Sequence, residues 1–271
     1  MTHDRSILNT IRGVLLDVDG TLWRGSQPVP GLAEFFALLR ARRIGCRIVT
    51  NNSLKPPEHY QAKLAGFGVV VASDAILTSA QATGRYLAQT LALGAPVYVI
   101  GEVGLLAAVQ QAGMVVVGDA AQPVAAVVVG GDRSLTYTKL KDAVLLLQRG
   151  APLIGTNPDL LVPTAVGLAP ETGTTLAALT AATGVAPTVI GKPAHWLFDV
   201  ALEQLGVAPG ESLMVGDRLE TDILGGQRAG LRTALVTTGV DGLDAVQSTG
   251  IQPDLVVADL LELVQRWECN L

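Results

Sequence analysis

Residues 14–22 read VLLDVDGTL, and this stretch determines the fold class. An apolar run leads directly into two carboxylates, Asp17 and Asp19, and then into a turn at Gly20. Uniformly apolar strands are typical of a parallel sheet that is covered on both faces. Ligands of open α/β sheets bind at the carboxyl ends of such strands, so we expect the two acids to lie at a functional site. The alternative is that Asp and Gly simply form a strand-ending turn.

The same pattern continues along the chain, where short β-branched runs alternate with longer segments rich in Ala and Leu. This alternation predicts an α/β protein in which crossover helices join parallel strands. The expected strands are residues 14–19, 47–51, 97–100, 114–117, 125–130, 153–156, 188–191, 212–216, 233–237 and 254–258. The expected helices are residues 32–42, 57–65, 79–93, 104–111, 137–148, 173–183, 195–205 and 221–229.

The composition excludes several classes of protein. Hydrophobic residues make up 49% of the 271 residues and charged residues 16%, which excludes intrinsic disorder. No segment offers the roughly 20 consecutive apolar residues that a membrane span needs, so we expect no membrane association. The net charge of −5, without a long basic run, argues against nucleic-acid binding.

The N-terminal segment and the cysteines suggest where the protein resides. Residues 1–13 lack the long apolar segment of a secretory signal. Cys46 and Cys269 are too few and too far apart for a disulfide framework or a Cys-x-x-Cys metal site, which agrees with a reducing compartment. We therefore expect a cytoplasmic protein.

Three further apolar strands lead into polar residues. Thr50 and Asn51 begin the segment TNNS, Lys192 lies in GKP, and Asp217 and Asp222 lie in GDRLETD. Taken singly, these segments also suit a helix N-cap, a solvated lysine and a solvated acidic loop. Taken together, the carboxylates form a set of oxygen ligands that suits Mg²⁺, which binds through one or two carboxylates and substrate phosphate. A cation is needed because a carboxylate that attacks an anionic phosphate must overcome charge repulsion.

These segments resemble the four motifs of the haloacid dehalogenase (HAD) superfamily of aspartate-nucleophile phosphohydrolases. The matching residues are DVDGT at 17–21, TNNS at 50–53, GKP at 191–193 and GDRLETD at 216–222. Further phrases are similar to the NagD-like, p-nitrophenylphosphatase-like branch (subfamily IIA). They are Leu22-Trp23, DRSLTY at 132–137 and TNPD at 156–159. From the sequence alone, Trp23 either lines the entrance of the site or packs in the core.

The resemblance implies a doubly wound parallel-sheet (Rossmann-like) core with an inserted α/β cap domain of the C2 type. The core comprises residues 1–77 and 189–271, and the cap residues 78–188. Composition alone is equivocal: residues 78–188 hold 5 Lys or Arg and 6 Asp or Glu, and the rest of the chain 14 and 18. Caps of this kind contribute to dimer contacts in similar proteins, which makes a homodimer through the cap one expectation.

The resemblance also assigns catalytic and metal-binding roles. Asp17 is the nucleophile that forms an aspartyl-phosphate. Asp19 is the general acid and base that protonates the leaving alkoxide and later accepts a proton from water. The Asp17 side chain, the Asp19 backbone carbonyl and Asp217 bind Mg²⁺. Asp222 either contacts the metal through water or orients Lys192.

The remaining implied roles concern the substrate, a small phosphorylated metabolite whose leaving group the sequence does not specify. Thr50 and Asn51 hydrogen-bond the phosphoryl oxygens, and Lys192 neutralises the charge that develops during transfer. In the cap, Asn157 and Asp159 are the candidates for contact with the leaving group.

Two other functions use overlapping chemistry. A phosphotransferase or phosphomutase has the same core and differs only in the acceptor, and the sequence does not separate it from a hydrolase. A phosphorylatable receiver-like switch would need Asp17, Thr50 and Lys192, but it has no need of an acid at Asp19. A carboxylate at that position therefore favours the enzyme, and we expect an Mg²⁺-dependent phosphoric monoester hydrolase.

Overall fold

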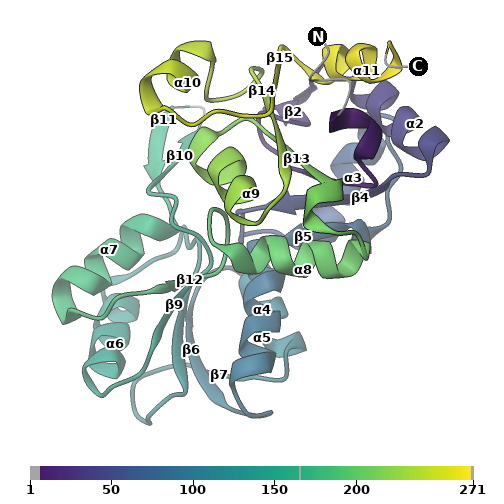
Figure 1. Ribbon diagram of the computed structural model, residues 1–271. Helices are drawn as coiled ribbons and strands as arrows, with labels where there is room; N and C mark the ends of the chain where they lie inside the picture. Colours follow the sequence, from purple (N-terminus) through teal and green to yellow (C-terminus); the bar gives the residue numbers. More distant parts are fainter. Residues whose placement is uncertain (1–6, 165, 270–271) are drawn as a thin grey trace. The chain divides into compact units, whose positions relative to one another are not determined.

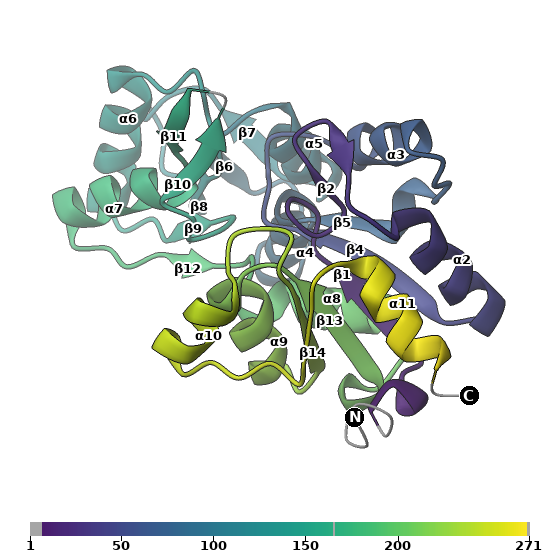
Figure 2. The same cartoon turned by 90° about the horizontal axis from the view of Figure 1, so that it is seen from above.

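The computed structural model describes residues 7–164 and 166–269, so residues 1–6 of the segment considered for a signal lie outside the described part. The chain divides into two compact units (Figures 1 and 2). The first unit comprises residues 1–49, 57–77 and 197–271, and the second comprises residues 50–56 and 78–196. Segments 50–56 and 189–196, which were expected in the core, thus group with the second unit. A cap role for this unit stays a prediction.

The first unit is built on a six-stranded sheet in the order β15-β14-β13-β1-β4-β5. The pairings of β1 with β13 and β4, and of β14 with β13 and β15, are parallel. The strands are β1 (Gly13–Leu16), β4 (Gly45–Thr50), β5 (Ile76–Thr78), β13 (Ser212–Gly216), β14 (Arg232–Val236) and β15 (Leu255–Val257). A short antiparallel hairpin, β2 (Trp23–Arg24) with β3 (Gln27–Pro28), follows β1.

Helices cover both faces of this sheet, which explains why its central strands are apolar throughout. Val14 and Leu16 belong to the core cluster that contains Phe35 and Trp267, whereas Leu235 packs with the cluster on the opposite face. Figures 1 and 2 show α2 and α11 on one side of the sheet and α8 on the other. The helices of this unit are α2 (Leu32–Arg42), α3 (Pro57–Gly66), α8 (His195–Leu205), α9 (Leu224–Arg228), α10 (Leu243–Thr249) and α11 (Leu260–Glu268). The first two residues of α8, His195 and Trp196, group with the second unit. The short turns are η1 (Ser73–Ala75), η2 (Pro209–Glu211) and the π-helical η3 (Leu219–Ile223).

The second unit contains a five-stranded parallel sheet in the order β12-β9-β8-β6-β7. Its strands are β6 (Pro96–Ile100), β7 (Val115–Val117), β8 (Ala126–Val129), β9 (Leu153–Gly155) and β12 (Thr188–Val189), and the hairpin β10 (Leu161–Thr164) with β11 (Gly167–Pro170) lies apart from that sheet. Its helices are α4 (Ser79–Thr90), α5 (Val103–Gln111), α6 (Tyr137–Gln148) and α7 (Thr172–Thr183). Figure 1 shows α4 and α5 on one face of the five-stranded sheet and α6 and α7 on the other.

Segment 50–56 is bonded into this second unit. The hydroxyl of Ser53 accepts a hydrogen bond from the Gly131 N–H (3.0 Å), and the Leu54 carbonyl accepts one from the Gly104 N–H (3.1 Å). A Cβ at position 104 would approach the Ser53 carbonyl oxygen to 2.6 Å, so the start of α5 requires glycine for this close contact. The segment is therefore part of the second unit's packing, although it directly follows β4 in the sequence.

The structure confirms the predicted α/β class and the doubly wound parallel sheet. It corrects the position of one strand: β12, which precedes Lys192, belongs to the five-stranded sheet rather than to the six-stranded sheet whose strand β1 precedes Asp17. Strand β5, both hairpins, α10 and α11 were not predicted from the sequence. Among the helices in residues 7–164 and 166–269, none is long and apolar enough to cross a bilayer.

Gly31 permits α11 to pack against the start of α2. Its φ is +81°, and a Cβ there would overlap the backbone at Leu260 and Leu261. We expect Gly31→Ala to lower the free energy of unfolding by roughly 2–5 kcal/mol, because left-handed strain adds to overpacking. Gly68 has the same φ, and a Cβ there would meet no atom of the described residues within 4 Å, so Gly68→Ala isolates the strain. Urea unfolding followed by tryptophan fluorescence measures both, and equal losses would contradict the packing argument.

Candidate functional site

Asp17 and Asp217 follow two neighbouring strands of the first unit. β1 pairs in parallel with β13, with Leu16 opposite Val215, and the Asp17 N–H donates to the Val215 carbonyl (2.9 Å). The two carboxylates therefore leave the sheet side by side at its carboxyl edge, where ligands of such sheets bind. Asp222 lies on the π-helical turn η3 that follows β13.

These three residues, Asp17, Asp217 and Asp222, form what we call the carboxylate cluster. One carboxylate oxygen from each lies within 4.8 Å of the others. Asp217 and Asp222 are each only 1% exposed, and Asp17 is half-buried. Like charges this close and this poorly hydrated repel one another strongly, so the arrangement favours a bound cation.

Backbone groups hold the buried members of the cluster in place. The Val240 N–H donates to Oδ2 of Asp217 (2.8 Å), and the Arg218 N–H donates to Oδ2 of Asp222 (3.1 Å). A Cβ at Gly20 or Gly239 would overlap the Asp217 carboxylate, so glycine at both positions leaves room for this side chain. The loops after β1 and β14 thus shape the space in which Asp217 lies.

Asp19 lies two residues beyond Asp17 and has an exposed side chain. Its Oδ1 accepts a hydrogen bond of 2.9 Å from the indole Nε1–H of Trp23. Gly20, with φ +87°, allows the tight turn between these two residues, in which the Gly20 N–H donates to the Trp23 carbonyl (2.8 Å). The acid predicted to transfer a proton is therefore hydrogen-bonded to a neighbouring ring.

The second unit brings together residues from three of the segments singled out in the sequence. The side-chain amide of Asn51 donates to the Lys192 carbonyl (2.9 Å) and to Oδ2 of Asp159 (3.1 Å). The Asn157 amide donates to the Asn51 carbonyl (2.8 Å), which also accepts from the Ser79 hydroxyl (2.6 Å). These bonds join the TNNS, TNPD and GKP segments into one polar network.

Asn157 and Lys192 are both buried within this arrangement, at 1% and 2% exposure. The Asn157 amide also donates to the hydroxyls of Thr156 and Thr172 (3.2 Å each), and its Oδ1 accepts from the Asp159 N–H (3.1 Å). Such bonding indicates a structural role for Asn157. The expectation that Asn157 and Asp159 contact a leaving group stays a prediction.

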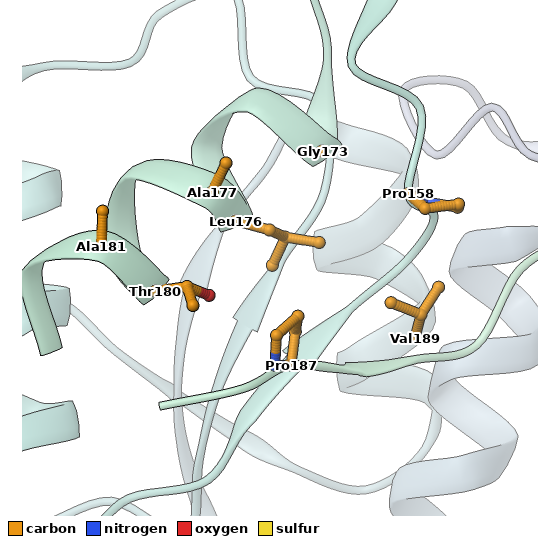
Figure 3. A pocket seen from close by; sticks show the side chains of 8 residues that line it. All are labelled: Pro158, Gly173, Leu176, Ala177, Thr180, Ala181, Pro187 and Val189. Carbon is orange, nitrogen blue, oxygen red and sulfur yellow. The ribbon is translucent and has the colours of Figure 1, made fainter. Parts of the chain in front are cut away.

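The second unit also contains an apolar pocket of about 410 Å³ beside α7 and β12, shown in Figure 3. Its lining residues are Pro158, Gly173, Leu176, Ala177, Thr180, Ala181, Pro187 and Val189. None of these side chains carries a charge, and Thr180 offers the only side-chain hydroxyl among them. This pocket is therefore unsuited to a phosphate group, and the polar clusters are the better candidates for the functional site.

Comparison with known proteins identifies the family. Residues 14–115 match the model for haloacid dehalogenase-like hydrolases, and residues 189–263 match a HAD-hydrolase-like model. The chain is also 37% identical to the 5′-nucleotidase YutF of Bacillus subtilis, over 95% of this chain and 99% of that protein. The chain belongs to the haloacid dehalogenase-like hydrolase family. The resemblance inferred from the motifs is thus confirmed.

Two further HAD relatives carry more specific names. The acid sugar phosphatase of Staphylococcus aureus is 38% identical, over 95% of this chain and 98% of its own length. The crystal structure of glycerol phosphate phosphatase from Mycobacterium tuberculosis in complex with magnesium is 35% identical, with a TM-score of 0.88. That match covers 97% of this chain and 79% of the other.

The structure adds two residues to those expected from the HAD motifs. Trp23 was ambiguous in the sequence; the structure packs its ring in the core of the first unit, at 1% exposure, with the indole N–H directed to Asp19. Lys63 on α3 was not singled out, although its Nζ lies 4.1 Å from the centroid of the Trp23 ring. No local pattern predicts this contact, because it depends on how α3 packs against the hairpin that follows β1.

The network around Asn157 leads to a prediction about stability. We expect Asn157→Ala to destabilise the second unit by roughly 2–4 kcal/mol, because several buried partners lose their hydrogen bonds. Thermal unfolding monitored at Trp196, which belongs to this unit, measures the effect. The control Asn52→Ala removes a local bond from the Leu54 N–H (2.9 Å), so a loss of about 1 kcal/mol is expected. Equal losses in the two variants would contradict a special role for Asn157.

Proposed function

We propose that this HAD protein is a phosphatase that hydrolyses small phosphate monoesters through an aspartyl-phosphate intermediate. The observation that carries the proposal is the carboxylate cluster at the ends of β1 and β13, with the exposed acid Asp19 two residues from Asp17. Support comes from the relatives named above, which are a nucleotidase, a sugar phosphatase and a glycerol phosphate phosphatase. Membership in a hydrolase family also favours hydrolysis over a phosphorylatable switch.

The carboxylate cluster fits Mg²⁺ by the chemistry of its donors. Hard oxygen ligands suit this ion, and the glycine positions at 20 and 239 leave room for the Asp217 carboxylate. We assign the side chains of Asp17 and Asp217 and the backbone carbonyl of Asp19 as the ligands, with Asp222 in support through water or through Lys192. When bound, the ion supplies positive charge that offsets the repulsion between a carboxylate and an anionic phosphate. A relative's structure that contains magnesium supports this assignment.

Asp17 is the nucleophile in the proposed reaction. Its carboxylate oxygen forms a bond to phosphorus while the bond from phosphorus to the leaving oxygen breaks. Asp19 gives its proton to that oxygen, so the alcohol departs neutral. Water then attacks the phosphorus of the aspartyl-phosphate, Asp19 takes a proton from it, and Asp17 and inorganic phosphate are released.

We assign the remaining motif residues to binding. The Thr50 hydroxyl accepts from the Asn52 N–H (3.1 Å), which leaves its own hydrogen to donate to a phosphoryl oxygen. Lys192 is proposed to neutralise charge on the phosphoryl group. The two hydrogens of the Asn51 side-chain amide bond the Lys192 carbonyl and Asp159, so the phosphate contact that we propose for Asn51, beside Thr50, is made by its backbone N–H. Asp159 is the proposed contact to the leaving group, and Asn157 holds its backbone N–H.

The nucleophile is tested by Asp17→Asn. An amide does not form the aspartyl-phosphate, so we expect hydrolysis of p-nitrophenyl phosphate to fall by on the order of 10³-fold or more. Asp74→Asn, which alters an exposed acid of the same unit, is the matched control and should retain activity. Near-normal turnover by a correctly folded Asp17→Asn protein would remove the covalent mechanism.

Metal binding is tested without an activity assay. Mg²⁺ at about 100 times its dissociation constant should stabilise the protein by about 2.7 kcal/mol, and this should appear as a higher unfolding temperature. We expect Asp217→Asn to lose most of this shift, whereas Asp244→Asn alters an exposed acid outside the cluster and should keep it. An equal shift in the two variants would refute the assigned ligands.

A further inference from the structure

The general acid proposed above is bonded to a side chain with no role in that mechanism. The Trp23 indole donates its Nε1–H to Oδ1 of Asp19 (2.9 Å). The two residues differ sharply in burial, because Asp19 is exposed and Trp23 is only 1% exposed. A solvent-facing carboxylate is thus tied to a fixed group in the core of the first unit.

The backbone between these residues is shaped to make that bond. The Leu22 N–H donates to the Val18 carbonyl (2.8 Å), and the Gly20 N–H donates to the Trp23 carbonyl (2.8 Å). These two bonds close a tight turn that returns the chain to Asp19, and the left-handed φ of Gly20 makes the turn possible. Asp19 and Trp23 also form an isolated bridge.

The Trp23 ring is held by α3 and the segment after it. Tyr60 stacks on it, with centroids 6.4 Å apart and an interplanar angle of 16°, and Phe67 packs at 6.0 Å. The Lys63 ammonium lies 4.1 Å from the ring centroid and donates to the Gly25 carbonyl (2.9 Å). Lys63 therefore contacts both the ring and the turn of the hairpin β2–β3.

The position of Lys63 also links it electrostatically to the acid. Burial lowers the pKa of Lys63, and the negative charge of Asp19 acts in the opposite direction. A cation over an indole face is attracted to the ring and fixes its orientation. The ammonium, the indole and the carboxylate thus form a chain of contacts within the first unit.

We propose that Trp23 is a positioning residue for the general acid and that Lys63 holds the Trp23 indole in place. The inference rests on the proposed phosphatase function. With Oδ1 of Asp19 held by the indole N–H, the other oxygen, Oδ2, carries the proton and presents it to the leaving oxygen. The bond limits rotation of the carboxyl group, so the acid meets the substrate already oriented, which is the kind of pre-organisation that proton transfer requires.

Trp23→Phe tests this inference, since it keeps an aromatic ring and removes the donor. Proton donation matters most when the leaving group is a poor one, so a misoriented Asp19 side chain should slow the reaction of such substrates most. We expect kcat to fall about 10-fold or more with glycerol phosphate and less than about 3-fold with p-nitrophenyl phosphate, at little changed KM. Trp267→Phe is the matched control, because the Trp267 indole is also buried in the first unit and its N–H has no hydrogen-bond partner among residues 7–164 and 166–269. This control should not alter the ratio of the two rates.

Lys63→Met provides a second test that leaves the core ring intact. We expect the same dependence on the leaving group with a smaller loss, and recovery in Lys63→Arg, which restores a cation over the ring. A double variant tests the coupling directly: Trp23→Phe should add no further loss to Asp19→Asn if the two act as one unit. Additive losses, or equal losses on both substrates, would overturn the inference.

Asp19→Asn alone separates failure of the inference from failure of the proposed function. If this variant shows no dependence on the leaving group, the general-acid role of Asp19 fails and the inference fails with it. If Asp19→Asn shows the dependence and neither Trp23→Phe nor Lys63→Met does, only the positioning role is wrong.

Discussion

The mutual repulsion of three carboxylates constrains the edge of the six-stranded sheet at which β1 and β13 end. Asp17, Asp217 and Asp222 present oxygens within 4.8 Å of one another, and two of the three side chains are buried. Such a cluster persists only where the fold imposes it and where positive charge is supplied. Here the parallel pairing of β1 with β13 imposes it, because adjacent strands end at the same edge. The glycines at 20 and 239 then allow the loops to close around Asp217.

The sequence was sufficient to predict that Asp17 and Asp217 lie close together, because this proximity depends on strand ends. The apolar run before Asp17 and the one before Asp217 marked them as central strands, and carboxyl ends of parallel strands meet. The same reasoning put the strand before Lys192 in the core, whereas that strand, β12, belongs to the five-stranded sheet of the second unit. A short strand of this kind suits either sheet. The residues around Thr188 and Val189 carry no signal that they pair with β9.

Two other features that were not expected from the sequence, helix α11 and the contact of Lys63 with Trp23, differ in their causes. Helix α11 carries a recognisable helical pattern, since Leu260, Leu263, Val264 and Trp267 share one buried face and Asp259 caps its start. This pattern is thus sufficient to predict the helix. The contact of Lys63 with Trp23 was not predictable, because it joins α3 to a hairpin about 40 residues earlier and each residue alone has an ordinary solvent-facing or core interpretation.

The bonding of segment 50–56 has a consequence for how such proteins could exchange parts. Ser53 and Leu54 make hydrogen bonds to the backbone of residues 131 and 104, so a continuous piece cut at 78 and 188 lacks partners that its own main chain uses. Recombination between relatives would have to transplant two separate stretches together to keep these bonds. The fold thus ties residues 78–188 to the TNNS segment upstream of them in the gene, and the two are expected to be inherited as a set.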